Sequence, residues 1–380
     1  MPPSPLPVLF MVQHLDSGGT EHHFHDLVTR LDRDLIAPHV IYCEPGIVSR
    51  QLEALDWLPV TRIPLTRAYD WSGLRAALRV RRYLRRHAIG AVVAFHFVAD
   101  FLAVLAAWPG PLPVISSRRD MGFTRTSRQI RIGRWMQPRI HRYIAVSGAV
   151  AEAVARDEAV PPGKISVIHN GIDLDRLHRE KGDAAAERAR LGIAPGELVI
   201  GCAATFNPVK RHDLLLEAFA RLRRAGGPPV RLLLAGDGPL AGEIAARRRA
   251  LGLERAVLMV GRSPRVAREL NAADIVALAS ETEGFSNAII QAMALGRPVV
   301  ACRVGGNPEA VHDGATGLLV PPNDPAAFAA ALERLVADEP LRREMGRRAA
   351  ELAAARFSLQ AMVERTQSLI LAAARPAALE

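Results

Sequence analysis

The sequence predicts an α/β protein built from two Rossmann-like domains, each with a parallel sheet between layers of helices. Short apolar runs alternate with helical patterns through both halves of the 380-residue chain, which is typical of repeated βα units. A chain of this length is too long for one ordinary hydrophobic core and suits two. A segment with prolines, glycines and then many polar residues, 160–190, separates the halves, so we place the domain boundary near residue 172.

The strand candidates are short apolar runs bounded by turn residues. In the first half they lie within 7–43, 58–63, 90–95, 112–116 and 142–146. In the second half they lie at 198–203, 231–235, 256–260, 274–279, 298–303 and 317–320. Runs of this length and composition fit strands that are buried on both faces of a sheet. Because the loops at the carboxyl ends of parallel strands bind ligands, we expect a ligand in the cleft between the two domains.

Composition restricts the partners and the compartment. Lysine plus arginine number 49 against 39 aspartate plus glutamate, giving a net charge of +10 and a pI of about 10.4, which favours acidic partners. Only three basic residues are lysines, Lys164, Lys181 and Lys210. The cysteines are isolated, so neither a disulfide framework nor a zinc site is expected. Residues 1–7 lack a signal-peptide pattern and no run could cross a bilayer, so we expect a soluble, cytoplasmic protein.

The most informative segment is 283–298, which follows an apolar run and places a carboxylate before a helix and a polar side chain inside it. Gly284 breaks the chain, and Ser286 is the expected N-cap of the helix. Unpaired amides at a helix start favour a phosphate, and here they would be those of Phe285, Ser286 and Asn287. An ordinary βα loop with a capped helix is the alternative.

Glu283 and Gln291 lie eight residues apart, and their segment resembles the Glu-x7-Glu motif of glycosyltransferase family 4, the retaining enzymes of the GT-B fold. Glu283 matches the first acid, and Gln291 stands where the second belongs. The resemblance implies that Glu283 binds hydroxyls of the transferred sugar and that residue 291 binds the ribose of the donor. It also implies an acceptor domain at 1–172 and a donor domain at 173–355. A last helix, within 356–380, would return to the first domain.

Lys210 follows the run 198–203 and stands at the entrance of a predicted helix. A point charge there would stabilise a leaving diphosphate. In the family an arginine usually lies five or six positions earlier and holds the same diphosphate, whereas this chain has Ala204 or Thr205 at that place. Arg211, or an arginine of the other domain, could supply the second charge.

The loop after the run 231–235 resembles a tight loop that the family places near the nucleotide. It contains Gly236 and Gly238, and Arg262 lies where the base would stack. The same glycines match the dinucleotide pattern G-x-G-x-x-A, so an NADP-dependent oxidoreductase is the rival enzyme. Pro239 and the position on a middle strand argue against it.

In the first half, candidate site residues follow the strand candidates. Gly18 and Gly19 resemble the family's Gly-Gly loop, whose amides could approach the donor diphosphate or the acceptor, although a tight turn alone would account for them. His96 ends the run 90–95 and resembles a histidine that many members carry there; a catalytic role and a buried, hydrogen-bonded one are both open. The resemblance places further acceptor-binding groups after the next strand, at Arg118, Arg119 and Asp120.

Two groups of arginines give the first half a basic surface. One lies on a predicted helix, 72–87, with the leucines expected largely on its other sides, and consists of Arg75, Arg79, Arg82 and Arg86. The second runs from Arg118 to Arg142. An anionic membrane surface or a lipid diphosphate acceptor would explain both groups, at about 1 kcal/mol for each basic side chain. A solvated arginine-rich face is the alternative, and nucleic-acid binding is disfavoured because neither group lies in a reader module.

The family resemblance carried by these patterns implies a retaining, hexosyltransferase-type enzyme that takes a UDP- or GDP-sugar and acts on a glycan or glycolipid in bacterial cell-surface polysaccharide or lipopolysaccharide synthesis. The Asp-x-Asp sequences at 32–34 and 173–175 do not end strands, so we expect no metal, and no cofactor is expected. Location on the inner face of the plasma membrane would fit the arginines. A nucleotide-sugar-binding subunit without activity is the non-enzymatic alternative, because of Gln291 and the missing arginine.

Overall fold

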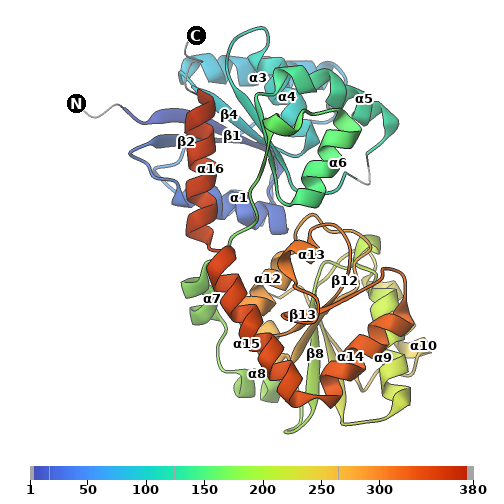
Figure 1. The fold of residues 1–380 in the computed structure, drawn as a ribbon. Helices are drawn as coiled ribbons and strands as arrows, with labels where there is room; N and C mark the ends of the chain where they lie inside the picture. Colours follow the sequence, from blue (N-terminus) through green and yellow to red (C-terminus); the bar gives the residue numbers. More distant parts are fainter. Residues whose placement is uncertain (1–3, 17, 123–124, 264, 375–380) are drawn as a thin grey trace. The chain divides into compact units, whose positions relative to one another are not determined.

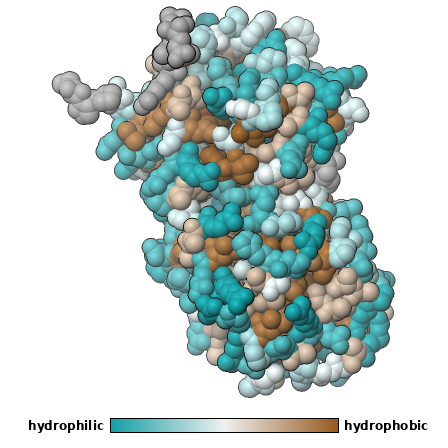
Figure 2. Space-filling model, viewed as in Figure 1, coloured by the Kyte–Doolittle hydropathy of each residue, from teal (hydrophilic) through white to brown (hydrophobic). Residues whose placement is uncertain are grey.

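The chain folds into two compact α/β units. The computed structural model describes residues 4–374 apart from 17, 123–124 and 264. The first unit comprises Met1–Gly171 with Gln360–Glu380, and the second comprises Ile172–Leu359. Helices flank a single parallel sheet in each unit (Figure 1). In the view of Figure 2, hydrophilic residues cover most of the surface of each unit and hydrophobic residues are confined to smaller patches.

The first unit contains a seven-stranded sheet of order β3-β2-β1-β4-β5-β6-β7, in which every neighbouring pair is parallel. Its strands are β1 (Leu6–His14), β2 (Ile36–Glu44), β3 (Val60–Arg62), β4 (Ala91–Phe95), β5 (Val114–Arg118), β6 (Arg142–Ala145) and β7 (Ile165–Val167). Its helices are α1 (Gly19–Arg30), α2 (Ile47–Glu53), α3 (Trp71–Arg86), α4 (Phe97–Ala107), α5 (Ser127–Met136), α6 (Gly148–Glu158) and α16 (Leu359–Ala374). The sequence patterns did not predict β7, which lies in the segment interpreted above as a linker. Its three residues are half-buried at the edge of the sheet, so they form no long apolar run.

The last helix, α16, contacts the first unit through polar groups. The Arg365 guanidinium donates to the Val167 carbonyl at 2.8 Å, and the Gln367 side chain accepts from the Asp32 amide at 2.9 Å. By its contacts the returning segment begins at Gln360, four residues later than the expected position. No helix within the described ranges is both long and apolar enough to span a bilayer.

The second unit contains a six-stranded parallel sheet of order β10-β9-β8-β11-β12-β13, whose strands overlap the six predicted runs. They are β8 (Leu198–Ala203), β9 (Val230–Ala235), β10 (Val257–Gly261), β11 (Ile275–Leu278), β12 (Val299–Cys302) and β13 (Gly317–Val320). The helices are α7 (Leu174–Glu180), α8 (Ala184–Arg190), α9 (His212–Ala225), α10 (Ala241–Ala250), α11 (Val266–Ala272), α12 (Asn287–Ala294), α13 (Asn307–Ala310), α14 (Pro325–Ala337) and α15 (Glu339–Arg356). Leu215, Phe219, Leu232 and Phe328 are in the core that α9 and α14 form with this sheet.

Strand order reverses beside the first strand of each sheet. β1 lies between β2 and β4, and β8 lies between β9 and β11. At such a switch point the loops at the carboxyl ends of the two strands leave toward opposite faces, and ligands of open parallel sheets bind between them. Gly18 and His96 follow β1 and β4, whereas Lys210 and Glu283 follow β8 and β11. These four predicted site residues therefore lie in loops at the two switch points.

Candidate functional site

At the switch point of the second unit, Lys210 contacts Glu283. Lys210 ends a 3-10 turn, Pro208–Lys210, which is held by Asn207: its side chain accepts from the Lys210 amide at 3.2 Å. The Lys210 Nζ lies 2.5 Å from Glu283 Oε1. The Glu283 side chain is 9% exposed and that of Lys210 is 22% exposed, so water competes only partly with this ion pair. A charge-assisted contact of this length holds both groups in a defined arrangement.

Residues that the sequence patterns did not single out hold Glu283 in place. The Ser280 hydroxyl donates to Glu283 Oε1 at 2.7 Å. Gly305 has φ +48°, and a Cβ there would lie 1.7 Å from the Glu283 carbonyl oxygen. The amide of Gly306 donates to the same carbonyl at 3.2 Å. The sequence signal for the Gly305 support was a glycine pair in the loop after a buried strand, the same signal that pointed to Gly18 and Gly19.

The helix after Glu283 begins where it was predicted. Ser286 is the N-cap of α12, and its hydroxyl accepts from the Ile289 amide at 3.4 Å. Phe285 is buried with its ring centroid 5.3 Å from that of Phe357, so its side chain belongs to the core and only its backbone could face a donor. Gln291 is half-buried on the second turn of the helix, as are Gly284 and Asn287 at its start.

The glycine loop after β9 packs closely against the loop after β8. A Cβ at Gly236 would lie 1.9 Å from the Ala204 carbonyl oxygen, and one at Gly238 would lie 2.5 Å from that of Phe206. The Phe206 amide also donates to the Asp237 carbonyl at 3.0 Å. Only glycine permits such an approach of two backbones. The dinucleotide-like spacing therefore has a cause within the fold that requires no dinucleotide.

The two arginines expected near the donor are placed differently. Arg211 adopts a left-handed backbone conformation, and its Nε donates to Asp213 Oδ1 at 3.0 Å while another nitrogen donates to Asn323. It is therefore already paired, which disfavours it as a substitute for the arginine that is absent near Thr205. Arg262 is exposed and follows β10, the edge strand of the sheet.

The two Asp-x-Asp sequences supply turn and cap residues. Asp173 is the N-cap of α7 and accepts from the Arg176 amide at 2.9 Å. Asp32 accepts from the Asp34 amide at 2.9 Å. Within the residues that the structure describes, no group of three or more His, Cys, Asp or Glu side chains is arranged to hold a metal ion.

At the switch point of the first unit, His14 and His96 lie side by side, with ring centroids 5.0 Å apart. His96 has φ 71°, a strained conformation of the kind that clusters at functional sites. Burial, assisted by His14, lowers the pKa of His96 to about 4, so its ring is neutral at physiological pH. His14, which ends β1 and was not singled out, has Nε2 3.5 Å from Glu21 Oε1. Gly18 is the N-cap of α1, where a Cβ would lie 2.2 Å from the other Glu21 oxygen.

Arg119 belongs to the same region, because its charge acts on His96. Burial lowers the pKa of Arg119 to about 9, against the opposing effect of Glu21, and its guanidinium donates to Asn170. Within the described part of the chain, Arg119 Nε and His96 Nδ1 are buried without a hydrogen-bond partner. Asp120 is exposed and closes a turn by accepting a backbone amide at 2.7 Å. Two unsatisfied nitrogens in one region indicate a place for a polar ligand.

Arg118 corrects the predicted acceptor site. Its side chain is 1% exposed and lies 3.1 Å from Asp100 Oδ2 on α4 and 2.7 Å from Glu158 Oε2 on α6. Desolvation lowers the pKa of Arg118, but the two carboxylates outweigh it and the net shift is upward. Ser116 donates to Asp100 at 3.0 Å, and Arg125 contacts the second oxygen of Glu158. Arg118 is thus inside the fold, so the second arginine group does not form one continuous surface.

Two Rossmann-like domains with sites at these switch points define the GT-B class of glycosyltransferase folds. Residues 183–352 match the family model described as glycosyl transferases group 1, and residues 17–176 match glycosyltransferase family 4. The two matches cover most of the chain, and it belongs to the family 4, or group 1, glycosyltransferases.

Curated relatives and solved structures resemble the chain in different ways. The D-inositol 3-phosphate glycosyltransferase of Segniliparus rotundus is 37% identical over 244 residues, which are 63% of this chain and 54% of that protein. The chain thus spans about half the length of the curated relatives it matches. HepE of Anabaena, solved with UDP and glucose, has a TM-score of 0.85 at 23% identity, covering 97% of this chain and 100% of that one. A glycosyltransferase from Rickettsia africae has a TM-score of 0.87 at 18% identity, covering 98% and 100%. At these identities the structures establish the fold.

Proposed function

We propose that this protein is a retaining glycosyltransferase that moves a sugar from a nucleoside diphosphate donor to a glycan or glycolipid acceptor. The contact between Lys210 and Glu283 carries the proposal, because it sets a cation beside a carboxylate at the switch point of the second unit. The family supplies the class of reaction. HepE, solved with UDP and glucose, favours a UDP-sugar over a GDP-sugar as the donor.

In the proposed reaction the second unit stabilises the leaving group. Lys210 neutralises charge that develops on the leaving phosphate, and the N-terminus of α12 adds the positive end of a helix dipole. Glu283 accepts hydrogen bonds from the sugar hydroxyls, and Ser280 positions its carboxylate. The acceptor oxygen bonds to the anomeric carbon as the bond to phosphate breaks on the same face of the sugar, and the leaving phosphate takes the acceptor's proton. Written this way, the step requires no metal ion and no cofactor.

We place the acceptor in the first unit, near His96, Arg119 and Asp120. His96 is neutral and can exchange hydrogen bonds with a hydroxyl, whereas the unsatisfied Arg119 Nε would suit an anionic group. The name of the Segniliparus rotundus relative, D-inositol 3-phosphate glycosyltransferase, favours a phosphorylated acceptor. A lipid-linked acceptor of this kind would fit a role in cell-surface polysaccharide or lipopolysaccharide synthesis.

Release of the nucleoside diphosphate tests the activity directly. The pure protein is incubated with UDP- and GDP-sugars, with and without phosphorylated and lipid-linked acceptors, and free UDP or GDP is measured. Acceptor-dependent release supports the transferase. Binding of a nucleotide-sugar without release under any of these conditions would point to the non-catalytic subunit, and thermal stabilisation by NADP alone would point to the oxidoreductase.

Replacing Glu283 by glutamine and replacing Gln291 by glutamate should change different kinetic constants. Glu283→Gln is expected to lower kcat by about tenfold or more, because a charge-assisted hydrogen bond to the sugar is lost. Gln291→Glu should retain kcat and change the KM for donor by no more than about fivefold, since it regains charge assistance to the ribose, worth about 1 kcal/mol, but adds a negative charge near the diphosphate. Initial rates over a range of donor concentrations separate the two effects. The reverse pattern would mean that the two roles are assigned wrongly.

We also propose that the protein works at the surface of an anionic membrane, through the arginines of α3. Sedimentation with anionic and with neutral vesicles at two salt concentrations tests this location, because attraction between exposed charges weakens as salt increases. Equal binding to both kinds of vesicle would exclude it.

A further inference from the structure

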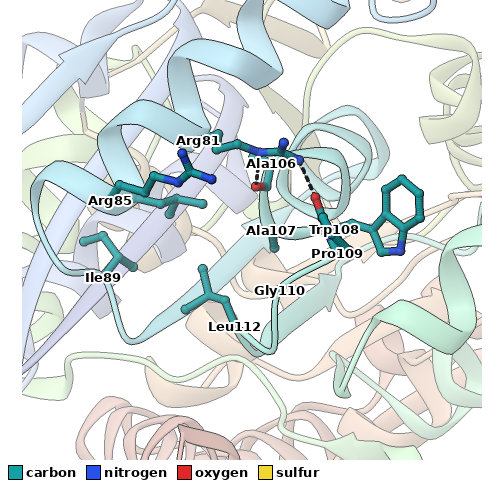
Figure 3. Close-up of a pocket in the computed structure, with 10 residues that line it drawn as sticks. Arg81, Arg85, Ile89, Ala106, Ala107, Trp108, Pro109, Gly110 and Leu112 are labelled. Atoms are coloured by element: carbon teal, nitrogen blue, oxygen red, sulfur yellow. Dashed lines mark hydrogen bonds between the residues drawn. The ribbon is translucent and has the colours of Figure 1, made fainter.

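A cavity of 310 Å³ lies at the C-terminal end of α3 in the first unit, away from the loops that carry the proposed chemistry (Figure 3). Its lining contains two arginines, no acidic residue and otherwise apolar side chains: Arg81, Leu84, Arg85, Ile89, Ala106, Ala107, Trp108, Pro109, Gly110 and Leu112. In Figure 3 the guanidinium groups of Arg81 and Arg85 lie along one side of the cavity, and Leu112 lies across from them. The cavity thus combines a cationic side with apolar walls.

The two arginines of this cavity have different roles. Arg81 is used by the fold, because its guanidinium donates to the carbonyls of Leu105 at 2.8 Å, Ala106 at 3.0 Å and Trp108, and so caps the end of α4. The Arg85 side chain has no hydrogen-bond or ion-pair partner among the described residues. Arg85 is therefore the cation available to a ligand in the cavity.

The outer face of α3 mixes arginines with large apolar side chains, which corrects the expectation that its leucines lie mostly on other sides. Trp71 is 76% exposed, Leu78 is 53% exposed and Leu74 is 44% exposed. At 100° per residue these three share the face that carries Arg75 and Arg82. Tryptophan and leucine beside basic residues are the composition of helices that lie in a membrane interface.

Tryptophan side chains also lie beside an arginine on the other side of the cavity. Trp108, on its rim, is 52% exposed, and the Arg139 guanidinium lies 5.7 Å from the centre of its ring. The same guanidinium lies 4.4 Å from the ring of Trp135, which is 40% exposed. The outer face of α3, the cavity and these two tryptophans thus form a Trp-Arg surface on the first unit.

The solvated face of another helix in this chain is built differently. On α15, Arg343, Arg347 and Arg348 each pair with a glutamate of the same helix. α3 contains six arginines and no acidic residue. Its charges therefore lack partners within the helix, as expected of a surface that meets an anionic one.

We propose that this cavity binds the phosphate headgroup of an anionic phospholipid, with Arg85 on the phosphate and the apolar walls against the start of the acyl region. The exposed Trp71, Leu74 and Trp108 then enter the interface of the bilayer around that lipid. Apolar walls and flanking tryptophans favour a lipid in a bilayer over a soluble phosphate. The site rests on the proposed location at an anionic membrane but not on the proposed transferase activity, since lipid binding needs neither donor nor sugar acceptor.

Vesicle binding by matched variants tests the site without donor or sugar acceptor. Binding to phosphatidylcholine vesicles with and without phosphatidylglycerol is measured by sedimentation for the parent chain, Arg79→Gln, Arg85→Gln, Ala107→Phe and Arg249→Gln. Arg79→Gln removes a charge of α3 outside the cavity and should weaken binding to anionic vesicles about fivefold, the equivalent of about 1 kcal/mol. Arg85→Gln should weaken it by more than about tenfold, because a direct contact to phosphate is lost as well. Ala107→Phe fills the cavity without changing charge and should also weaken it by about tenfold.

Each control decides between a headgroup site and general attraction. Arg249→Gln removes an exposed charge from α10 of the second unit and should leave vesicle binding unchanged. If Arg85→Gln weakens binding no more than Arg79→Gln, and Ala107→Phe has no effect, the surface attracts the membrane without a headgroup site and the proposal is wrong. Displacement from vesicles by inorganic phosphate at constant ionic strength would also overturn it, because the cavity would then take a soluble anion.

Discussion

Replacing Lys210 by alanine is expected to lower kcat for sugar transfer by about 10²- to 10³-fold, the loss typical when one preorganised group is removed from a developing negative charge. Arg211 cannot replace it without breaking its contacts to Asp213 and Asn323. The expected loss is in kcat more than in KM, because Lys210 acts on charge that appears as the phosphate leaves. Initial rates of nucleoside diphosphate release over a range of donor concentrations measure both constants.

The chain provides a close control for Lys210. Lys181 is a half-buried lysine of the same unit, at the end of α7 and away from the switch point, so Lys181→Ala should retain parental kinetics. Thermal unfolding of the Lys210 variant is measured alongside, because Glu283, whose side chain is only 9% exposed, loses its cation. Near-normal turnover by a folded Lys210→Ala protein would remove this lysine from the mechanism.

Replacing Arg118 by methionine is expected to destabilise the first unit by about 3–5 kcal/mol, because two buried carboxylates lose the cation between them. The side chains of Asp100 and Glu158 are fully buried, so water cannot replace the guanidinium. Arg125 contacts only Glu158, which leaves Asp100 with Ser116 alone. Urea-induced unfolding followed by circular dichroism measures the loss.

The destabilisation caused by Arg118→Met should depend on pH. Burial raises the pKa of Asp100 to about 7 although Arg118 opposes the rise, so removal of Arg118 raises that pKa further. The folded variant then holds a proton that the unfolded chain, with an aspartate pKa of about 3.9, has released. Its stability deficit relative to the parent should therefore shrink as the pH falls from alkaline values toward about 7, where the folded parent has released this proton, and should change little below about 6, where Asp100 is protonated in both folded proteins. A deficit that stays constant over this range would show that packing, not charge, is the cause.

A surface arginine of the same unit is the control for Arg118. Arg156 pairs with Asp157 on α6, and its side chain is 69% exposed. Arg156→Met should leave the free energy of unfolding nearly unchanged, since exposed ion pairs contribute little. An equal loss in both variants would contradict the assignment of Arg118 as the buried centre of this network.

Sequence patterns were sufficient where the signal is local. Runs of apolar residues predicted all six strands of the second unit, and the N-cap preference of serine predicted the start of α12 at Ser286. They failed where burial depends on neighbours in space. Arg118 looked like a residue of the site because it is polar and ends a strand, but the fold buries it. Leu78 was expected away from the arginines of its helix, but it is exposed on the face that carries two of them.

The sequence by itself determined the α/β class, the order of the elements, the excess of arginine and the family, because periodicity, charge and motif spacing are properties of neighbouring residues. Only the tertiary structure decided that Lys210 lies 2.5 Å from Glu283, 73 positions away, and that Ser280 and Gly305 support that carboxylate. The pairing of β8 with β11 brings these groups together. Which strands become neighbours depends on how the whole core packs, and the spacing of residues along the chain does not specify that order.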